Sequence, residues 1–340
     1  MAVIIGIDPH KLLHAAYAID EHEQELARLE VHADARQCDQ LLEWAAAFEC
    51  RRWAIESASG LGALLAQQLV GAGEHVVDVP ATLSSRVRLL GTGRSNKNDT
   101  NDARAVAVAA LRAPSLAVVG SEDHTTVLRL LAKSHLDIGR HRSQACARLH
   151  ALVRELIAGG IRKDIVVSQA ETILTTFEPA TFVQAQRLEL AWEIVDDIRR
   201  LDAKQKRSKQ RIVAAVDASG TCLVDIYGVG PIIAATIIGY SGNVRRFATA
   251  GHYAAYNGTA PIEFSSAGRV AHRLSRRGNR TLNHVIHMAA VTQIRHPDTE
   301  GRRYYEAKLA AGKTKREALR ALKRKTSDRI YRALLADTRK

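Results

Sequence analysis

The sequence contains few cysteines, and none of them have the spacing of a metal-binding pair. The four residues are scattered along the chain with no CxxC motif: Cys38, Cys50, Cys146 and Cys222. This spacing argues against a structural zinc site and against a disulfide framework. We therefore expect reduced thiols in or near hydrophobic cores.

Long apolar runs are also missing. No segment approaches the roughly 18 uninterrupted apolar residues that a membrane span requires. At the N-terminus, MAVIIGIDPHK places an acid where a signal peptide would continue its apolar core. No GxGxxG motif follows this segment, so a dinucleotide site is not expected. The sequence predicts a cytoplasmic protein with no membrane partner.

Positive charge is abundant and lies at one end of the chain. The 340 residues carry a formal net charge of +13. Between Arg269 and Lys340 there are 20 Lys and Arg residues against six Asp and Glu, a net charge of +14, so the preceding residues sum to about −1. A stretch this basic favours binding to a nucleic-acid backbone over a merely solvated surface.

The first 115 residues have an α/β pattern. Strand-like runs cover residues 2–8, 12–19, 27–31, 53–55 and 75–79, whereas helical spacing appears at 37–48, at 61–70 and from about Thr100 onward. The order β-β-β-α-β-α-β-α predicts an α/β domain over residues 1–115 that is not a plain Rossmann alternation.

The rest of the chain is predicted to be mainly helical. Seam positions alternate by three and four at Leu128, Leu131, His135, Ile138, Arg142, Ala145, Leu149, Leu152 and Leu156. A second helix follows from Leu188 to Ile212, which predicts an antiparallel, coiled-coil-like arm over residues 120–217. Glycines 220, 228 and 230 open a basic, mainly α domain over 220–340. Its GVG turn between apolar helices fits either a phosphate-binding helix-hairpin-helix or an ordinary tight turn.

Four carboxylates form a candidate metal site. Asp8 and Glu56 each end a predicted strand, and Asp99 and Asp102 lie three residues apart on one helix face. Carboxylates at strand ends converge at the carboxyl edge of a sheet. Each acid alone could be a turn or cap residue, but four together require cations, and their oxygens suit Mg²⁺ or Mn²⁺. Two such ions can clamp the oxygens of phosphoryl transfer.

Two serines form a second candidate site. Ser265 and Ser266 are predicted to lie in a loop beside Gly268, ahead of Arg269, Arg273, Arg276, Arg277 and Arg280. Serine is a weak nucleophile unless it is activated or the phosphorus is strongly electrophilic, and arginines can bind phosphate oxygens bidentately. Composition alone favours loop and cap roles for the two serines.

The motifs IGIDPHK, AIES, NKNDTNDARAVAVA, GVGPIIAA, YNGTAPIEFSSAG and RRGNRTLN occur in this order. In this combination the sequence resembles DEDD-type insertion-sequence transposases related to the Piv DNA invertases, which are bridge-RNA-guided recombinases. The resemblance covers almost the whole chain. It implies a RuvC-like RNase H fold with a mixed sheet, whose acidic tetrad is Asp8, Glu56, Asp99 and Asp102, and a C-terminal transposase domain with a serine nucleophile.

The resemblance also implies a mechanism and partners. The serine would attack a DNA phosphodiester to form a covalent phosphoserine, with Mg²⁺ at the acids. The partners would be element-end and target DNA, a structured noncoding RNA and further copies of the chain, as dimers assembling to a tetramer. The expected location is the bacterial cytoplasm, at the nucleoid during action. Many relatives have Ser-Ser-Gly where this chain has Ser-Ser-Ala-Gly, and we favour Ser266 over Ser265. Lys97 is a candidate phosphate contact or a solvated residue.

Two other functions fit the same residues. In a Holliday-junction-type nuclease the four acids would hydrolyse DNA with water, and the serine would be incidental. In a non-enzymatic protein that binds RNA or DNA, the basic C-terminal region would carry the whole function. The two motif clusters favour the recombinase.

Overall fold

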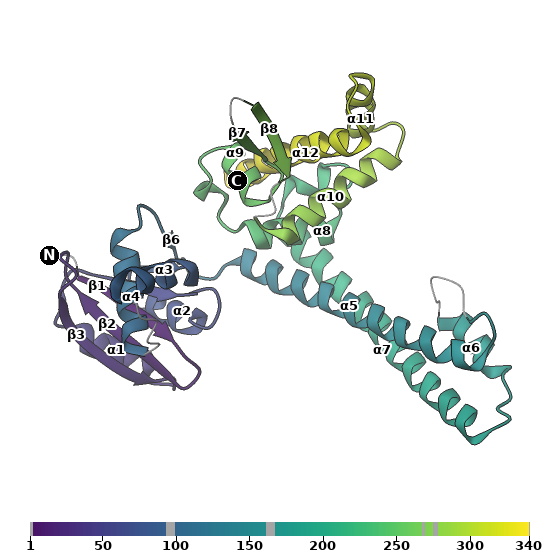
Figure 1. The fold of residues 1–340 in the computed structure, drawn as a ribbon, viewed down its shortest axis with the longest axis horizontal. Helices are drawn as coiled ribbons and strands as arrows, with labels where there is room; N and C mark the ends of the chain where they lie inside the picture. The colour runs from purple at the N-terminus through teal and green to yellow at the C-terminus, as the bar shows by residue number, and fades with distance from the viewer. Residues whose placement is uncertain (1–2, 93–98, 161–166, 267–268, 275–277, 340) are drawn as a thin grey trace. The chain divides into compact units, whose positions relative to one another are not determined.

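The computed structural model describes residues 3–92, 99–160, 167–266, 269–274 and 278–339 (Figure 1). The side chains of residues 90–92, 99–100, 262–266 and 269–274 lie outside this description. The chain forms two compact units, Met1–Glu122 and Asp123–Lys340. No helix in the described ranges is both long enough and apolar enough to cross a membrane.

The first unit is built on a six-stranded mixed sheet. Its strands are β1 (Val3–Pro9), β2 (Leu13–Ile19), β3 (Glu25–His32), β4 (Arg51–Glu56), β5 (Val76–Val79) and the short β6 (Ala117–Val118). They lie in the order β3-β2-β1-β4-β5-β6. The first three strands form an antiparallel meander, β4 and β5 add in parallel to β1, and β6 returns antiparallel.

Helices cover both faces of this sheet. Alternation along β1 sends Ile5 and Ile7 into one core with α1 (Gln37–Ala45) and α2 (Ala63–Gly71). Ile4 faces the opposite core, which contains Val106 of α4 (Asp99–Arg112). A further helix, α3 (Ala81–Thr92), packs beside α4. Strands buried on both faces explain the near-continuous apolar runs of β1 and β2.

The strand order confirms the predicted α/β fold of the RNase H-like, RuvC-like type with a mixed sheet. Two elements were missed. No element was predicted between the strand at 75–79 and the helix from about Thr100, but Ala81–Thr92 form α3. The strand β6 was also not predicted, because two residues give no periodicity.

A glycine allows α4 to lie directly on β1. A Cβ at Gly6 would lie 2.3 Å from the carbonyl oxygen of Ala103 and 2.5 Å from the amide nitrogen of Ala107. Both are backbone atoms of α4, which cannot move aside alone. Any larger residue at this position would therefore push the helix off the sheet.

In the second unit, α5 (His124–Leu156) and α7 (Phe182–Ala218) pack side by side as a long antiparallel pair, with α6 (Val167–Thr175) at its far end (Figure 1). Arg142 pairs with Asp202, whereas Glu155, farther along α5, pairs with Arg187, earlier in α7. These pairings establish the antiparallel direction.

A sustained coiled-coil seam is not supported. Ala132 and Val153 are buried on α5, whereas the predicted seam positions Leu131 and Leu152 are only partly buried. From Ala145 onward the buried positions recur every four residues. A coiled-coil seam would instead alternate spacings of three and four residues.

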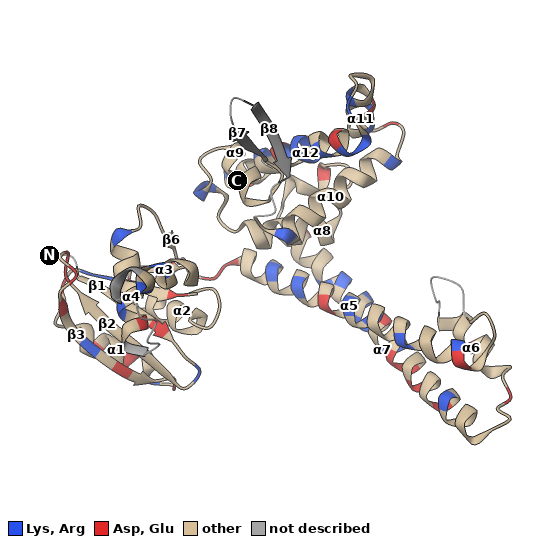
Figure 2. Ribbon diagram, in the orientation of Figure 1, with Lys and Arg blue, Asp and Glu red and all other residues tan. Residues whose placement is uncertain are grey.

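The remaining chain folds around the base of this pair. Its elements are η1 (Cys222–Asp225), α8 (Pro231–Ser241), η2 (Val244–Arg246), α9 (Ala250–Tyr256), β7 (Pro261–Ser266), β8 (Arg269–Leu274), α10 (Arg280–Arg295), α11 (Glu300–Ala310) and α12 (Lys315–Asp337). One core joins α8, α10 and α12 to Leu128 of α5 and Ile212 of α7. Lys and Arg residues recur along α12 (Figure 2). The expected mainly α architecture is present.

Three local predictions were wrong. Ser265 and Ser266 are not in a loop, because they are the last residues of β7, paired with β8. The GVG turn follows the short 3-10 helix η1 rather than an apolar α-helix, and Gly228, with φ of 85°, packs against Ala289 of α10. Cys50 is exposed rather than near a core; all four cysteines are free thiols.

Candidate functional site: an acidic cavity at the sheet edge

Two neighbouring parallel strands place Asp8 and Glu56 together. The register of β1 and β4 aligns Ile7 with Ile55, so the residues that follow them are adjacent. Because side chains alternate, Asp8 lies on the same face as Ile4, and Glu56 lies on the same face as Ala54. Ile4 and Ala54 belong to the core beneath α4. Both carboxylates therefore lie on the α4 side of the sheet.

The helix α4 contributes Asp102 to the same place. Asp102 comes directly before Ala103, the residue whose carbonyl oxygen packs over Gly6. This close approach places Asp102 near the carboxyl end of β1. Asp102 is 2% exposed, and Asp8 is 6% exposed.

The three acids line one cavity of about 270 Å³. Its walls come from the end of β1, the end of β4 and from α3 and α4, and the lining residues are Asp8, Pro9, His10, Glu56, Ser57, Leu61, Ala81, Arg88 and Asp102. The structure thus brings together three members of the predicted tetrad. Asp99 is the first residue of α4, and its side chain lies outside the described residues.

Each of the three carboxylates has a defined partner. The imidazole Nε2 of His10 lies 3.0 Å from Asp8 Oδ2. The Ser84 hydroxyl donates to Glu56 Oε1 at 2.5 Å. Arg88 Nη1 lies 2.6 Å from Asp102 Oδ1, an ion pair without hydrogen-bond geometry at that oxygen. A cationic side chain therefore neutralises one of the acids.

Burial destabilises the negative charge on Asp8. It raises the pKa of this carboxyl to about 6; the His10 hydrogen bond opposes the increase, and the neighbouring Glu56 carboxyl adds to it. Two facing carboxyl groups in a partly closed cavity repel each other unless a proton or a cation lies between them. The site can thus attract a positive ion.

The donor set fits a hard divalent cation at Asp8 and Glu56. Both side chains offer carboxylate oxygens, which Mg²⁺ and Mn²⁺ prefer. No three His, Cys, Asp or Glu side chains within the described ranges are close enough to form a metal-binding group. Asp102 is held by Arg88, so it would join Asp8 and Glu56 at an ion only after this pair opens.

The loop after Glu56 is fixed by β5. Ser57 has φ of 51°, a left-handed conformation that is uncommon outside glycine. The Ser57 amide donates to Val79 O, and the Ala58 amide donates to Asp78 Oδ1 at 2.9 Å. These contacts hold the wall of the cavity next to Glu56.

The predicted serine and basic residues are placed only in part. Ser265 and Ser266 end β7 in the second unit, opposite Val270 and Arg269 of β8. The side chains of Ser265, Ser266, Arg269 and Arg273 lie outside the described residues, as do Lys97, Arg276 and Arg277 altogether. Arg280 is the exposed first residue of α10.

Sequence reasoning missed three residues of the cavity: His10, Ser84 and Arg88. His10 could have been found from strand alternation, since it follows Asp8 by two residues. Ser84 and Arg88 share a helix face by their spacing of four, but this signal required α3 to be predicted first.

Two family profiles match the chain in order. One, described as "Transposase", matches residues 5–158, which include the acidic cavity. The other, described as "Transposase IS116/IS110/IS902 family", matches residues 220–306, which include both serines.

Whole-length relatives agree with these matches. The chain is 26% identical to the "Insertion element IS116 uncharacterized 44.8 kDa protein" of Streptomyces clavuligerus, over 98% of this chain and 95% of that protein. It is 28% identical to a "Probable family 20 transposase" of Pseudomonas aeruginosa, over 86% of this chain and 84% of that protein.

Among solved structures, Thermus thermophilus RuvC in complex with a Holliday junction substrate matches with 18% identity and a TM-score of 0.28. The match covers 35% of this chain and 100% of that chain. The two profiles together span well over half of the chain, and the relatives span nearly all of it. The protein therefore belongs to the IS110/IS116 family of insertion-element transposases.

Proposed function

We propose that the protein is a DNA recombinase that moves an insertion element by cutting and rejoining DNA through a phosphoserine intermediate. The observation that carries this proposal is the convergence of Asp8, Glu56 and Asp102 on one cavity, in a chain whose two matched regions both belong to transposases. Asp99, at the start of α4, completes the proposed tetrad.

In this proposal the acids bind Mg²⁺, or Mn²⁺ in its place. A bound divalent cation would supply positive charge to the phosphate oxygens. Asp8 and Glu56 provide oxygen ligands from adjacent strands, while His10 orients the Asp8 carboxylate and Ser84 orients that of Glu56. If Asp102 also held the cation, the Arg88 guanidinium would be free to bind a phosphate oxygen.

The covalent step is assigned to Ser266, with Ser265 as the alternate. The serine oxygen forms a bond to phosphorus as the bond from phosphorus to the leaving DNA oxygen breaks. The hydroxyl proton leaves the serine, and the departing oxygen takes up a proton. A DNA hydroxyl then attacks the phosphoserine, which restores the serine and rejoins the strand. Arg269, Arg273, Arg276, Arg277 and Arg280 would bind phosphate oxygens near this point.

We also propose a structured noncoding RNA partner and a tetramer formed from dimers. The net charge of +14 after residue 268 supports a polyanionic partner such as an RNA. Residues 120–217 would serve as the arm and residues 220–340 as the transposase domain, with Lys97 as a further phosphate contact. Gel shift with the RNA transcribed from the flank of the element tests the RNA partner.

The decisive experiment is denaturing electrophoresis of the protein with labelled element-end DNA, the flanking RNA and Mg²⁺. We expect a covalent protein–DNA band that disappears with Ser266→Ala and with Asp8→Asn. Loss with Ser265→Ala instead would reassign the nucleophile. Free cleaved strands that persist in both serine variants would contradict the serine mechanism and indicate a metal-dependent nuclease.

A further inference from the structure

A second cavity lies where α12 meets the segment that leads into the serine strand. It has a volume of about 360 Å³, within the range of about 300–1,000 Å³ typical of ligand pockets. One wall is residues 258–261, the last of which, Pro261, begins β7. The other is basic: Lys313, Glu317, Arg320, Ala321, Lys323 and Arg324.

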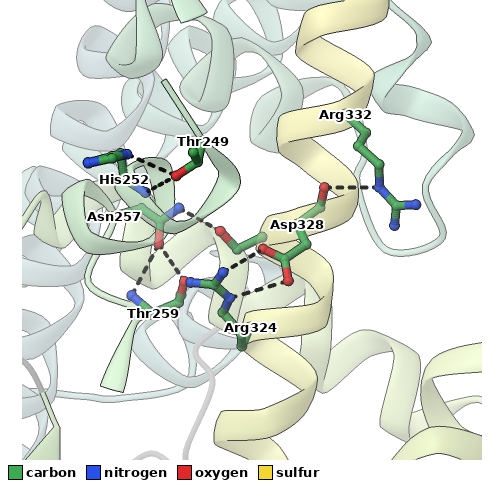
Figure 3. A network of polar contacts seen from close by, with 8 residues as sticks. Thr249, His252, Asn257, Thr259, Arg324, Asp328 and Arg332 are labelled. Atoms are coloured by element: carbon green, nitrogen blue, oxygen red, sulfur yellow. Dashed lines mark hydrogen bonds and ion pairs between the residues drawn. The ribbon is translucent and has the colours of Figure 1, made fainter. Parts of the chain in front are cut away.

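The charges of this cavity are unbalanced. Glu317 is its single acid among the described lining residues, and its carboxylate accepts hydrogen bonds from the Thr314 amide and hydroxyl at the start of α12. Arg324 pairs with Asp328 beside Asn257 and Thr259 (Figure 3). Within the described part of the chain, Lys313, Arg320 and Lys323 form no ion pair within 4.0 Å.

Lys323 connects the cavity to the start of the serine strand. Its Nζ donates to Asn283 Oδ1 at 2.8 Å, and Asn283 Nδ2 donates to the carbonyl oxygens of Asn257 and Gly258, each at 3.0 Å. Burial lowers the pKa of Lys323, and the nearby Arg280 lowers it further. An anion in the cavity would stabilise the charged form of Lys323 and so oppose the effects of burial and of Arg280.

The lining chemistry selects the kind of anion. The described lining residues include no aromatic ring on which a base could stack, and they include several cations. The amides of Gly258, Thr259 and Ala260 are already engaged by Ala255 O, Asn257 Oδ1 and Ala254 O. The cationic side chains are therefore the donors that remain. Such groups bind the phosphates of a nucleic acid and do not recognise its base sequence.

We propose that this cavity binds a backbone phosphate of the nucleic acid that is held at the serine strand, through Lys313, Arg320 and Lys323. Ser265 lies four residues beyond Pro261, about 13 Å along an extended strand. The cavity would hold a phosphate a short distance along the same nucleic acid from the reacting one. This inference rests on the proposed function, because it takes the serine strand to be where nucleic acid lies.

The test uses the full-length protein and the salt dependence of its binding to labelled single-stranded DNA and RNA oligonucleotides of the same sequence. Arg320→Ala and Lys323→Met each remove one contact, and Lys323→Arg keeps the charge. The matched control is Arg332→Ala, because Arg332 is also exposed on α12 but does not line the cavity; its guanidinium donates to the Asp328 carbonyl of its own helix.

We expect Arg320→Ala and Lys323→Met to weaken binding roughly tenfold, with a salt slope that is smaller by about 0.7 per lost contact. Lys323→Arg should retain binding. A loss of binding to DNA alone or to RNA alone identifies which nucleic acid supplies the phosphate. A loss of binding to both means that either nucleic acid can supply it. Affinities and slopes equal to those of Arg332→Ala in both arms would overturn the proposal.

The Arg320→Ala variant is expected to fold like the wild type, because the Arg320 side chain is exposed and its removal leaves the Asn283 hydrogen bonds in place. A loss of binding in this variant is therefore not explained by misfolding. The covalent band separates the two proposals. If wild-type protein forms no serine-dependent band but the cavity variants lose binding, the phosphate site stands and the recombinase mechanism fails. If the band forms and the cavity variants bind like the control, the phosphate site fails alone.

Discussion

Gly6 determines how closely the helix bearing Asp102 approaches the strand bearing Asp8. A methyl group at this position would overlap backbone atoms of α4. We expect Gly6→Ala to lower the free energy of unfolding by about 1–3 kcal/mol or more and to abolish activity, because α4 must shift. Urea denaturation measures the first effect. Gly71→Ala is the control, since nothing lies within 4 Å of a Cβ there; equal stability of the two variants would contradict the close-packing argument.

We expect the Asp8 carboxylate to lower the stability of the fold, although the proposed metal site requires it. Asp8→Asn removes one of two facing carboxyl groups from a buried site, so we expect a higher melting temperature than wild type in buffer without divalent ions. Added Mg²⁺ should raise the melting temperature of wild type but not of the variant. Ser84→Ala, which leaves both carboxylates in place, should keep the Mg²⁺ response. A variant that still responds to Mg²⁺ would place the ion elsewhere.

The residues of the acidic cavity differ in whether they could be predicted from the sequence. Asp8 and Glu56 could be predicted because each ends an apolar run, and the ends of parallel strands meet at one sheet edge. Arg88 could not, because its role depends on the path of α3 across that edge. The pairing of Arg88 with Asp102 is a tertiary contact with no local signal.

At the scale of elements, the start of β4 is held by an ion pair. Arg51 and the Trp53 indole both donate to Glu74, just before β5. Burial acts to raise the pKa of Glu74, but these hydrogen bonds outweigh it and the pKa is lowered. A lowered carboxyl pKa stabilises the fold above the unfolded-state value, and this stabilisation is lost as pH falls through the folded-state value.

We therefore expect Glu74→Gln to be less stable than wild type at pH 7, with the difference shrinking as the pH falls below about 4.5. Urea midpoints measured from pH 7 to pH 3 check this. Glu49→Gln is the control, because Glu49 forms no ion pair within the described residues and should leave the pH profile unchanged. A Glu74→Gln deficit that stays constant down to pH 3 would show that the carboxylate charge is not responsible.

The α5–α7 pair offers a matched test of helix packing. Leu149 of α5 is fully buried against α7, whereas Leu130 on the same helix is 63% exposed. We expect Leu149→Ala to cost about 2–5 kcal/mol of unfolding free energy and Leu130→Ala less than about 0.5 kcal/mol. Circular dichroism during urea denaturation compares them. Similar losses would mean that α5 does not pack in this register.

Elements with strong periodicity could be predicted, and the others required tertiary information. The strands β1 to β5 and the helices α5 and α7 follow clear apolar patterns. The hairpin β7–β8 did not, because serines and arginines occupy positions where strand patterns normally show apolar residues. The two short segments pair through backbone hydrogen bonds, which leave no signal in the sequence. This is why a loop was predicted for Ser265 and Ser266.

For the whole molecule, the two proposed chemical groups lie in different compact units. The acids belong to Met1–Glu122 and the serines to Asp123–Lys340. If the active oligomer builds each site from the acids of one subunit and the serine of another, a subunit that lacks one group can be complemented by a subunit that lacks the other. Two individually inactive variants then test the assembly directly.

We expect Asp8→Asn protein and Ser266→Ala protein to be inactive alone and to form the covalent band when mixed, because some composite sites then combine intact acids with an intact serine. Random mixing of equal amounts should restore a minor fraction of the wild-type band, and adding Asp8→Asn to Ser266→Ala in increasing ratio should give a maximum near equal amounts. The Asp8→Asn/Ser266→Ala double variant, mixed with either single variant, is the control and should restore nothing. A mixture that stays inactive, while size-exclusion chromatography shows mixed oligomers, would mean that each chain supplies both groups to its own site.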